Sequence, residues 1–173
     1  MSSYKQVLSA LALTAIAGTA TAAFPERELS GAIMWGAGGA TDVVARALNP
    51  HAEAVLGKKI VLVNRAGGTG AISTNYVITQ QADGYTILYG AENPQLHQVL
   101  SLADFGYEKF YPVSILGRGV AVIVVKADSP YASLKAFVDD AKAKPGKLKM
   151  GSTGPGGLPH TVGSMLNSVT KFQ

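Results

Sequence analysis

A glycine-rich junction at residues 36–39 constrains the fold of this chain more than any other feature. An apolar run over residues 29–34 precedes it, which favours a β-strand, and apolar side chains recur with helical spacing from Val43 to Leu48. Glycine tolerates positive φ angles and lets a ligand approach the main chain closely. The first turn of the helix, expected at residues 40–42, has free backbone N–H groups that favour an anion. The junction therefore predicts a strand, a turn and a helix, and both a structural turn and an anion site fit it.

The residues around this junction exclude two common phosphate-binding motifs. The dinucleotide fingerprint needs a third glycine and an acidic residue after the next strand, expected at residues 59–63, and neither is present. A P-loop needs a Gly-Lys-Ser or Gly-Lys-Thr sequence after the glycines, which is also missing. No side-chain base or nucleophile stands beside the glycines, and Arg46, one turn further on, is expected to point to solvent.

The first 22 residues have the three regions of a secretory signal peptide. Lys5 provides the positive n-region, residues 7–18 the apolar core, and Ala20-Thr21-Ala22 the small-residue cleavage site. We therefore expect an exported, periplasmic protein, and an uncleaved N-terminal anchor is the alternative. No later stretch approaches the roughly 20 apolar residues that a membrane span needs. The chain has no cysteine, so disulfides cannot stabilise it.

The composition indicates a globular protein suited to small acidic ligands. Hydrophobic residues make up 47% of the 173 residues, enough for the core of one domain or two small lobes. The formal net charge of +4 helps to attract an acidic small molecule, whereas the scattered positive residues do not support nucleic-acid binding. His51, His97 and His160 are far apart, which argues against a metal site. We expect no cofactor, and we expect His51 on the surface and His97 as an ordinary helix residue.

Strands and helices alternate after the first junction. We expect further strands at residues 59–63 and 85–90, separated by a second glycine-rich loop and a helix at residues 71–80. This alternation predicts right-handed βαβ units and a mostly parallel sheet. Ligands of such sheets bind beyond the carboxyl ends of the strands. Three loops meet there, at residues 36–42, 64–70 and 90–93.

Proline interrupts the first helix. Pro50 cannot donate a hydrogen bond to the carbonyl of Arg46, so we expect a kink, or a restart with Asn49 as the new cap.

The later residues predict a second unit of the same kind. We expect strands at residues 110–116, 120–125 and 147–150, a crossing segment at 126–130 and an amphipathic helix at 134–143. Residues 151–157 then repeat the glycine-rich loop, and a helix begins at about Pro159 or His160. Ser152 and Thr153 add hydroxyl donors. Two such loops, facing one another, could bind a small dicarboxylate with micromolar affinity, which requires about 8 kcal/mol.

Five segments of the chain stand in a characteristic order: Trp35 to Arg46, Val63 to Gly67, Ala82 to Thr86, Ala141 to Leu148, and Gly151 to Gly154 with His160. Together they resemble the Bug family, the periplasmic solute-binding receptors of tripartite tricarboxylate transporters. The resemblance implies an α/β fold of the type II periplasmic-binding-protein kind. In that fold two lobes with mostly parallel sheets close over a small organic acid. It also implies integral membrane transporter subunits as partners.

The resemblance further implies a binding site for the carboxylate of the ligand. Backbone amides and bridging waters would hold it at Gly38 to Asp42 and at Ser152 to Gly154. Asp42 is expected to cap its helix or to order the loop, and Trp35 either to wall the pocket or to belong to the core. The expected ligand-binding residues are Trp35, Gly38, Gly39, Ala40, Thr41, Asp42, Asn93, Ser152, Thr153, Gly154 and His160.

The length of the chain departs from the family pattern, because such receptors are nearly twice as long. We therefore expect a C-terminally truncated receptor, with a signal peptide at residues 1–22, a first lobe at 23–125 and the start of a second lobe at 126–173. Departures at Met34, Pro50, Ala71 and Glu92-Asn93 leave the identity of the ligand open.

Two other functions remain as alternatives. One is an exported α/β hydrolase-type enzyme, with Ser152 as nucleophile and His160 or His97 as base. The sequence Gly151-Ser152-Thr153-Gly154 lacks the Gly-x-Ser-x-Gly spacing of such enzymes. The other alternative is a nonfunctional fragment of a receptor.

Overall fold

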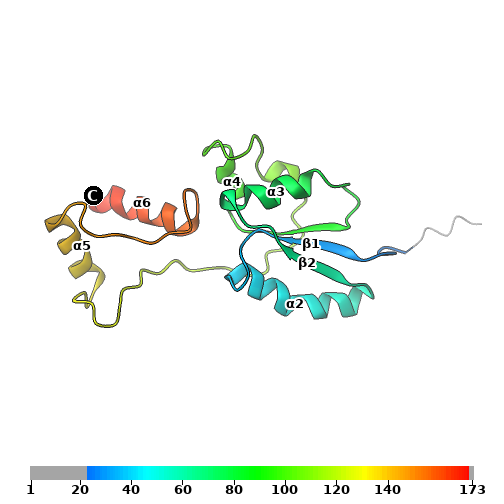
Figure 1. The fold of residues 1–173 in the computed structure, drawn as a ribbon, viewed down its shortest axis with the longest axis horizontal. Coiled ribbons are helices and arrows are strands. Elements are labelled where there is room, and N and C mark those ends of the chain that lie inside the picture. Colours follow the sequence, from blue (N-terminus) through cyan, green and yellow to red (C-terminus); the bar gives the residue numbers. More distant parts are fainter. Residues whose placement is uncertain (1–22, 172–173) are drawn as a thin grey trace, which may run out of the picture.

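The computed structural model of the chain describes residues 23–171, so the predicted signal peptide lies outside the described residues. The polypeptide forms two parts joined by a long extended segment (Figure 1). We call residues 23–110 the sheet part and residues 131–171 the helical part. The elements of the sheet part are β1 (Leu29–Ile33), α2 (Ala40–Leu56), β2 (Ile60–Asn64), η1 (Gly68–Gly70), α3 (Ala71–Ile78), β3 (Thr86–Tyr89), α4 (Pro94–His97) and η2 (Tyr107–Lys109).

A three-stranded parallel sheet forms the centre of the sheet part, with strand order β2-β1-β3. Helix α2 covers one face of this sheet, and α3 and α4 lie on the other (Figure 1). The central strand β1 contributes Leu29, Ala32 and Ile33 to the core, and the adjoining Met34 is completely buried beside them. The predicted parallel βαβ arrangement is confirmed. Because β1 is central and parallel to both neighbours, the loops after β1, β2 and β3 leave the same edge of the sheet.

Helix α2 is continuous through Pro50, so the predicted restart at Asn49 was wrong. Asn49 does not cap a new helix. Its amide donates to the Ile60 carbonyl at 3.1 Å and to the Glu53 carboxylate at 3.0 Å, and that carboxylate accepts the Ile60 N–H at 2.8 Å. Pro50 itself lies on the exposed side of the helix, where water can bond the carbonyl that the proline leaves free. These side-chain contacts fasten the helix to the start of β2.

The segment between the two parts forms no strands, so the predicted strands at residues 110–116 and 120–125 were wrong. Its apolar side chains face solvent, as the 84% exposure of Val113 and the 85% exposure of Val120 illustrate. β-branched residues favour extended backbone, but a strand also needs a neighbour to bond. No described residue pairs with this segment.

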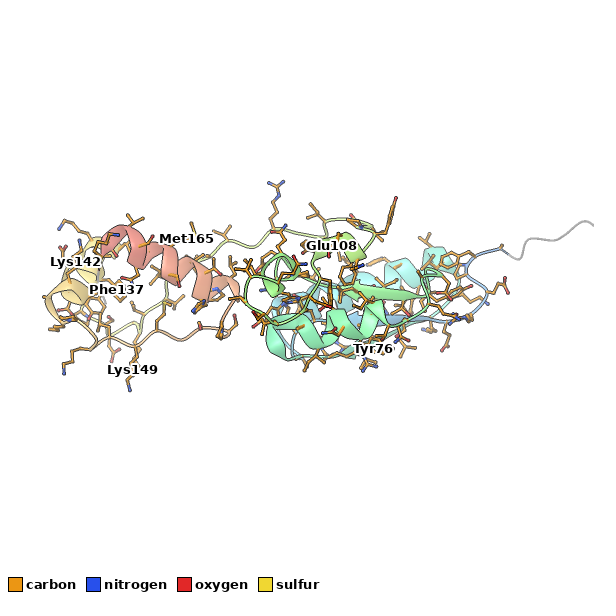
Figure 2. All side chains as sticks on the ribbon, turned by 90° about the horizontal axis from the view of Figure 1, so that it is seen from above. Tyr76, Glu108, Phe137, Lys142, Lys149 and Met165 are labelled. Carbon is orange, nitrogen blue, oxygen red and sulfur yellow. The ribbon has the colours of Figure 1, made fainter. Side chains whose placement is uncertain are left out.

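The helical part contains α5 (Leu134–Ala143) and α6 (Leu158–Thr170). The Ser133 hydroxyl caps α5 by accepting the Ala136 N–H at 3.2 Å. Tyr131 packs edge-on against Phe137, which Figure 2 shows in the helical part along with Met165 of α6. The predicted strand at residues 147–150 does not form, because the described residues offer it no neighbour either. The division of the chain into lobes at residue 125 stays a prediction.

Among residues 23–171 we find no helix with the length and apolar character that a membrane crossing demands.

Candidate functional site

The glycine-rich junction after β1 forms a tight turn that opens onto helix α2. The Gly39 N–H donates to the Gly36 carbonyl at 3.2 Å, and Gly38 has a left-handed φ of +80°. Gly39 then caps α2 with its backbone alone. Within the described residues, the N–H groups of Ala40, Thr41 and Asp42 have no hydrogen-bond acceptor. As the sequence predicted, the start of α2 presents free donors beyond the carboxyl end of β1.

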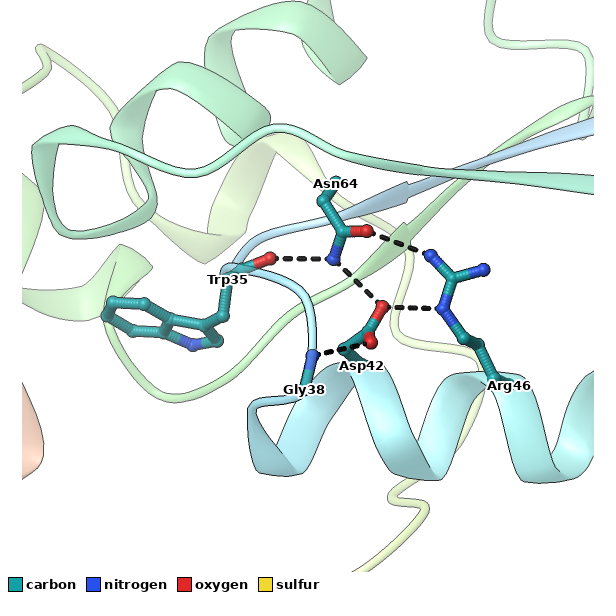
Figure 3. Close-up of polar contacts among 5 residues, drawn as sticks. All are labelled: Trp35, Gly38, Asp42, Arg46 and Asn64. Carbon is teal, nitrogen blue, oxygen red and sulfur yellow. Dashed lines mark hydrogen bonds and ion pairs between the residues drawn. The ribbon is translucent and has the colours of Figure 1, made fainter.

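The Asp42 carboxylate holds this turn in place through hydrogen bonds (Figure 3). One of its oxygens accepts the Gly38 N–H at 2.9 Å. The other accepts the Asn64 amide at 2.9 Å and the Arg46 Nε at 2.8 Å. Asn64 also donates to the Trp35 carbonyl at 2.9 Å and accepts from Arg46 Nη2 at 2.8 Å. Asp42 therefore orders the loop, which is one of the two roles expected of it.

The hydrogen bonds to Asp42 keep its carboxyl ionised. The Gly38 N–H, the Asn64 amide and the Arg46 guanidinium together hold the pKa of Asp42 below its ordinary value of 3.8, against the opposing effect of burial. Asp42 is only 4% exposed. The carboxylate is thus ionised at neutral pH, and its two oxygens accept hydrogen bonds from Gly38, Asn64 and Arg46.

Two residues of this cluster make contacts that the sequence analysis did not predict. Arg46 is exposed, as predicted, but its guanidinium also reaches back one helical turn to bond Asp42, a contact that was not predicted. Asn64 was not singled out at all. As the last residue of β2 it pairs in register with Ile33, so its position at the carboxyl end of the sheet was the signal that could have found it.

The Trp35 indole lies on the other side of the loop from the polar cluster (Figure 3). The side chain is half-buried, and only its carbonyl takes part in the cluster, as the acceptor for Asn64.

The second glycine-rich loop repeats the same turn in front of α6. The Gly157 N–H donates to the Gly154 carbonyl at 3.1 Å, Gly156 has a φ of +79°, and Gly157 caps the helix with its backbone. Pro159 has no N–H, and within the described residues the N–H groups of Leu158 and His160 have no hydrogen-bond acceptor.

The predicted hydroxyl and imidazole groups lie around this second turn. Ser152, Thr153 and His160 are exposed. The Ser152 hydroxyl accepts the Gly154 N–H at 3.3 Å, and no hydrogen bond joins Ser152 to His160 in the described part of the chain. The serine and histidine of the hydrolase alternative are therefore not arranged as a nucleophile and its base.

The second loop contacts the sheet part directly. The Thr69 hydroxyl donates to the Pro155 carbonyl at 2.7 Å, and the Asn93 amide donates to the Gly156 carbonyl at 2.8 Å. Asn93 was predicted to bind ligand, but its amide N–H here bonds the helical part and its side chain is fully buried. His97 belongs to α4, as expected of a helix residue, and is buried, with Nε2 2.9 Å from the Thr69 carbonyl. His51 is exposed, as predicted.

The structure thus brings the loops after β1 and before α6 to facing sides of the two parts. Helices α2 and α6 both begin on the side where the sheet part and the helical part meet (Figure 1). A hollow lined by Arg27, Ser30 and Asp83 lies instead at the amino ends of the strands, on the opposite edge of the sheet. In residues 23–171 there is no group of three or more acidic, histidine or cysteine side chains that could hold a metal ion.

Solved structures with this fold are α/β periplasmic binding proteins. The periplasmic binding protein BugD is 27% identical and aligns with a TM-score of 0.64 over 87% of this chain and 51% of BugD. MatC (Rpa3494) from Rhodopseudomonas palustris, determined with bound malate, is 23% identical and aligns with a TM-score of 0.72 over 87% of this chain and 52% of MatC. The predicted fold class, an α/β protein of the periplasmic-binding-protein kind, is confirmed.

Within that class the chain belongs to the tripartite tricarboxylate transporter family of receptors, whose family model matches residues 44–170. Protein BugT of Bordetella pertussis is 33% identical over 143 residues, which are 80% of this chain and 44% of BugT. The chain spans about half the length of the relatives it matches. This match confirms the resemblance inferred from the five segments. The family consists of solute-binding receptors rather than enzymes.

Proposed function

We propose that this chain captures a small dicarboxylate between the first turns of α2 and α6, as the receptor of a secondary transporter. One observation carries the proposal. Two helices begin with the same glycine-capped turn, on facing sides of the molecule, and each turn leaves backbone N–H groups without an acceptor among the described residues. A dicarboxylate has two anionic groups that such a pair of helix starts can bind at once.

The binding free energy available at the first turns of α2 and α6 is sufficient for micromolar affinity. A helix N-terminus favours an anion by roughly 0.3–1 kcal/mol when exposed and up to about 2 kcal/mol when partly buried. Hydrogen bonds to a charged group add roughly 1.5–3 kcal/mol each. Three or four such bonds, reduced by the loss of ligand freedom, are compatible with the roughly 8 kcal/mol of micromolar binding. The Ser152 and Thr153 hydroxyls and the His160 imidazole are exposed beside the second turn and can supply further donors.

The relationship to MatC supports this class of ligand, because malate is a four-carbon dicarboxylate. The family description supports delivery of the ligand to membrane subunits of a tripartite transporter. The signal-peptide pattern at residues 1–22 supports export to the periplasm, where such a receptor would meet its ligand. Binding requires no catalytic residue and no cofactor.

Calorimetric titration of the full chain with malate, alongside mono-, di- and tricarboxylates of similar size, tests the proposal. We expect saturable binding of at least one dicarboxylate with a micromolar dissociation constant. The dimethyl ester of the same acid is the matched control, since it keeps the carbon skeleton and loses both charges. Equal binding of the acid and its ester, or no binding of any carboxylate by the folded chain, would refute the anion site.

A further inference from the structure

We infer that Thr69 and Asn93 are positioning residues, which dock the second glycine-rich loop on the sheet part and so set the place of α6 relative to α2. We call Thr69, Asn93 and His97, with the Pro155 and Gly156 carbonyls that the first two bond, the latch. The inference that this loop is docked rests on the observed contacts alone. Its effect on ligand affinity rests on the proposed function.

Thr69 is held in an unfavourable conformation at the centre of the latch. Its φ of 52° and ψ of 39° are left-handed, a region that β-branched residues avoid. Two bonds fix it there, since its carbonyl lies 2.9 Å from His97 Nε2 and its hydroxyl donates to the Pro155 carbonyl at 2.7 Å. Non-glycine residues in such conformations persist where the surroundings over-determine them, and they gather at clamps and switches.

Asn93 makes the second bond of the latch from a fully buried position. Its amide nitrogen donates to the Gly156 carbonyl at 2.8 Å, whereas its side-chain oxygen has no hydrogen-bond partner in the described part of the chain. His97 Nδ1 is likewise buried without a partner there. Buried polar atoms without a partner oppose the arrangement that buries them. The docked state therefore combines two hydrogen bonds with three features that oppose it, namely the left-handed backbone of Thr69 and the two buried atoms without partners.

The two glycine-rich turns show what the docking requires. A Cβ atom added at Gly38 would meet no atom within 4 Å. At Gly156, which has the same φ, an added Cβ would lie 2.2 Å from Leu100 Cδ1 and 3.6 Å from Thr69 Cγ2. The first turn thus has open space around Gly38, whereas the second turn packs directly against the sheet part at Gly156. A side chain at position 156 would therefore obstruct the docking, and one at position 38 would meet no neighbour.

A ligand that bridges the starts of α2 and α6 favours the docked state, because only then do both sets of N–H groups stand at fixed separation. The latch supplies the fixed geometry without touching the ligand. In this arrangement Asn93 acts on the ligand through Gly156 and the loop before α6.

The experiment measures docking directly, without ligand. The chain has no cysteine, so spin labels can be attached at V99C and M165C, two exposed positions on the sheet part and the helical part. We expect one narrow distance distribution in the otherwise unchanged full chain. Thr69→Val, which keeps the shape and removes the hydroxyl donor, should broaden or shift it, and Asn93→Leu should do the same. Thr69→Ser, which restores the donor, should recover the narrow distribution.

Thr79→Val is the matched control, since the Thr79 hydroxyl bonds only within its own helix end. An unchanged distribution in both Thr69→Val and Asn93→Leu, each with a normal thermal transition, would overturn the latch. If malate binds the parent chain, Thr69→Val should weaken it roughly 3- to 10-fold and Thr69→Ser should restore it. Failure of every carboxylate to bind the parent chain would refute the proposed function, while the label distances would still decide the latch.

Discussion

Gly38 and Gly156 adopt the same backbone conformation, with φ angles of +80° and +79°, and each precedes a glycine that caps a helix in extended conformation. The two turns are nevertheless fixed by different means. Asp42, the third residue of α2, accepts the Gly38 N–H, whereas His160, the third residue of α6, makes no such bond in the described part of the chain. The first turn is thus fixed by its own helix, and the second by docking on Thr69 and Asn93.

Replacing Asp42 by a neutral residue should loosen the first turn. It should also make the stability of the fold depend less on pH in the acidic range. The folded-state pKa of Asp42 is lowered, chiefly by the Gly38 N–H and then by Asn64. As the pH falls, the unfolded chain therefore takes up this proton first. The stability that ionised Asp42 provides is present above the ordinary value of 3.8 and is lost as the pH falls through the lower folded-state pKa.

We therefore expect Asp42→Asn to lower the melting temperature at pH 7. Between pH 5 and pH 3 the melting temperature of this variant should fall less than that of the parent chain. Melting curves across that range measure the effect. Asp139→Asn, which removes an exposed carboxylate from a surface ion pair, is the control for the loss of one negative charge and should change the melting temperature little at pH 7. Parallel curves for Asp42→Asn and the parent chain would contradict the assigned role of Asp42.

Gly38→Ala should destabilise the chain through backbone conformation alone. An added methyl group at Gly38 meets no neighbouring atom, so the left-handed φ is the only penalty, roughly 1–2 kcal/mol. The melting temperature should fall by roughly 2–8 °C. Gly36→Ala is the matched control, because Gly36 also has open space around it and lacks the left-handed φ. If the two variants have the same melting temperature, Gly38 does not have a left-handed φ in solution.

The sequence was informative wherever local chemistry decides the structure. The helical spacing of apolar residues after Gly39 predicts α2, and the β-branched run at residues 59–63 predicts β2. The two glycine-rich turns follow from residue types that permit a left-handed φ. Ser133 caps α5 through a side chain whose preference for that position is intrinsic.

The errors of the sequence analysis arise where partners distant in sequence decide the outcome. The run at residues 110–125 has strand composition, but a strand forms only when another strand bonds it, and composition carries no information about that neighbour. Asn64 joins the Asp42 cluster through a contact that spans 22 residues. The contact of Asn93 with Gly156 spans 63 residues, and no local pattern at Asn93 indicates it.

Pro50→Ala should stabilise helix α2. The helix runs through the proline, so an alanine there can donate to the Arg46 carbonyl and removes the ring from the helix interior. After allowance for the greater freedom of the unfolded chain, we expect a gain of roughly 1–2 kcal/mol in the free energy of unfolding. Denaturation with urea measures it. Pro130→Ala, at an exposed proline outside the helices, should give no gain. A loss of stability in Pro50→Ala would show that the proline fits the helix better than its chemistry indicates.

Thr41→Pro should weaken ligand binding while leaving the fold intact. Proline removes one of the three free N–H groups at the start of α2, and the corresponding residue of α6 is already Pro159, so this position tolerates the ring. If the N–H bonds a carboxylate, its loss should reduce malate affinity roughly 10- to 150-fold. Calorimetric titration measures the change. Lys135→Pro, at the same position of α5, is the matched control and should leave affinity unchanged. Unaltered affinity in Thr41→Pro, with a normal melting transition, would mean that the ligand does not contact the Thr41 N–H at the start of α2.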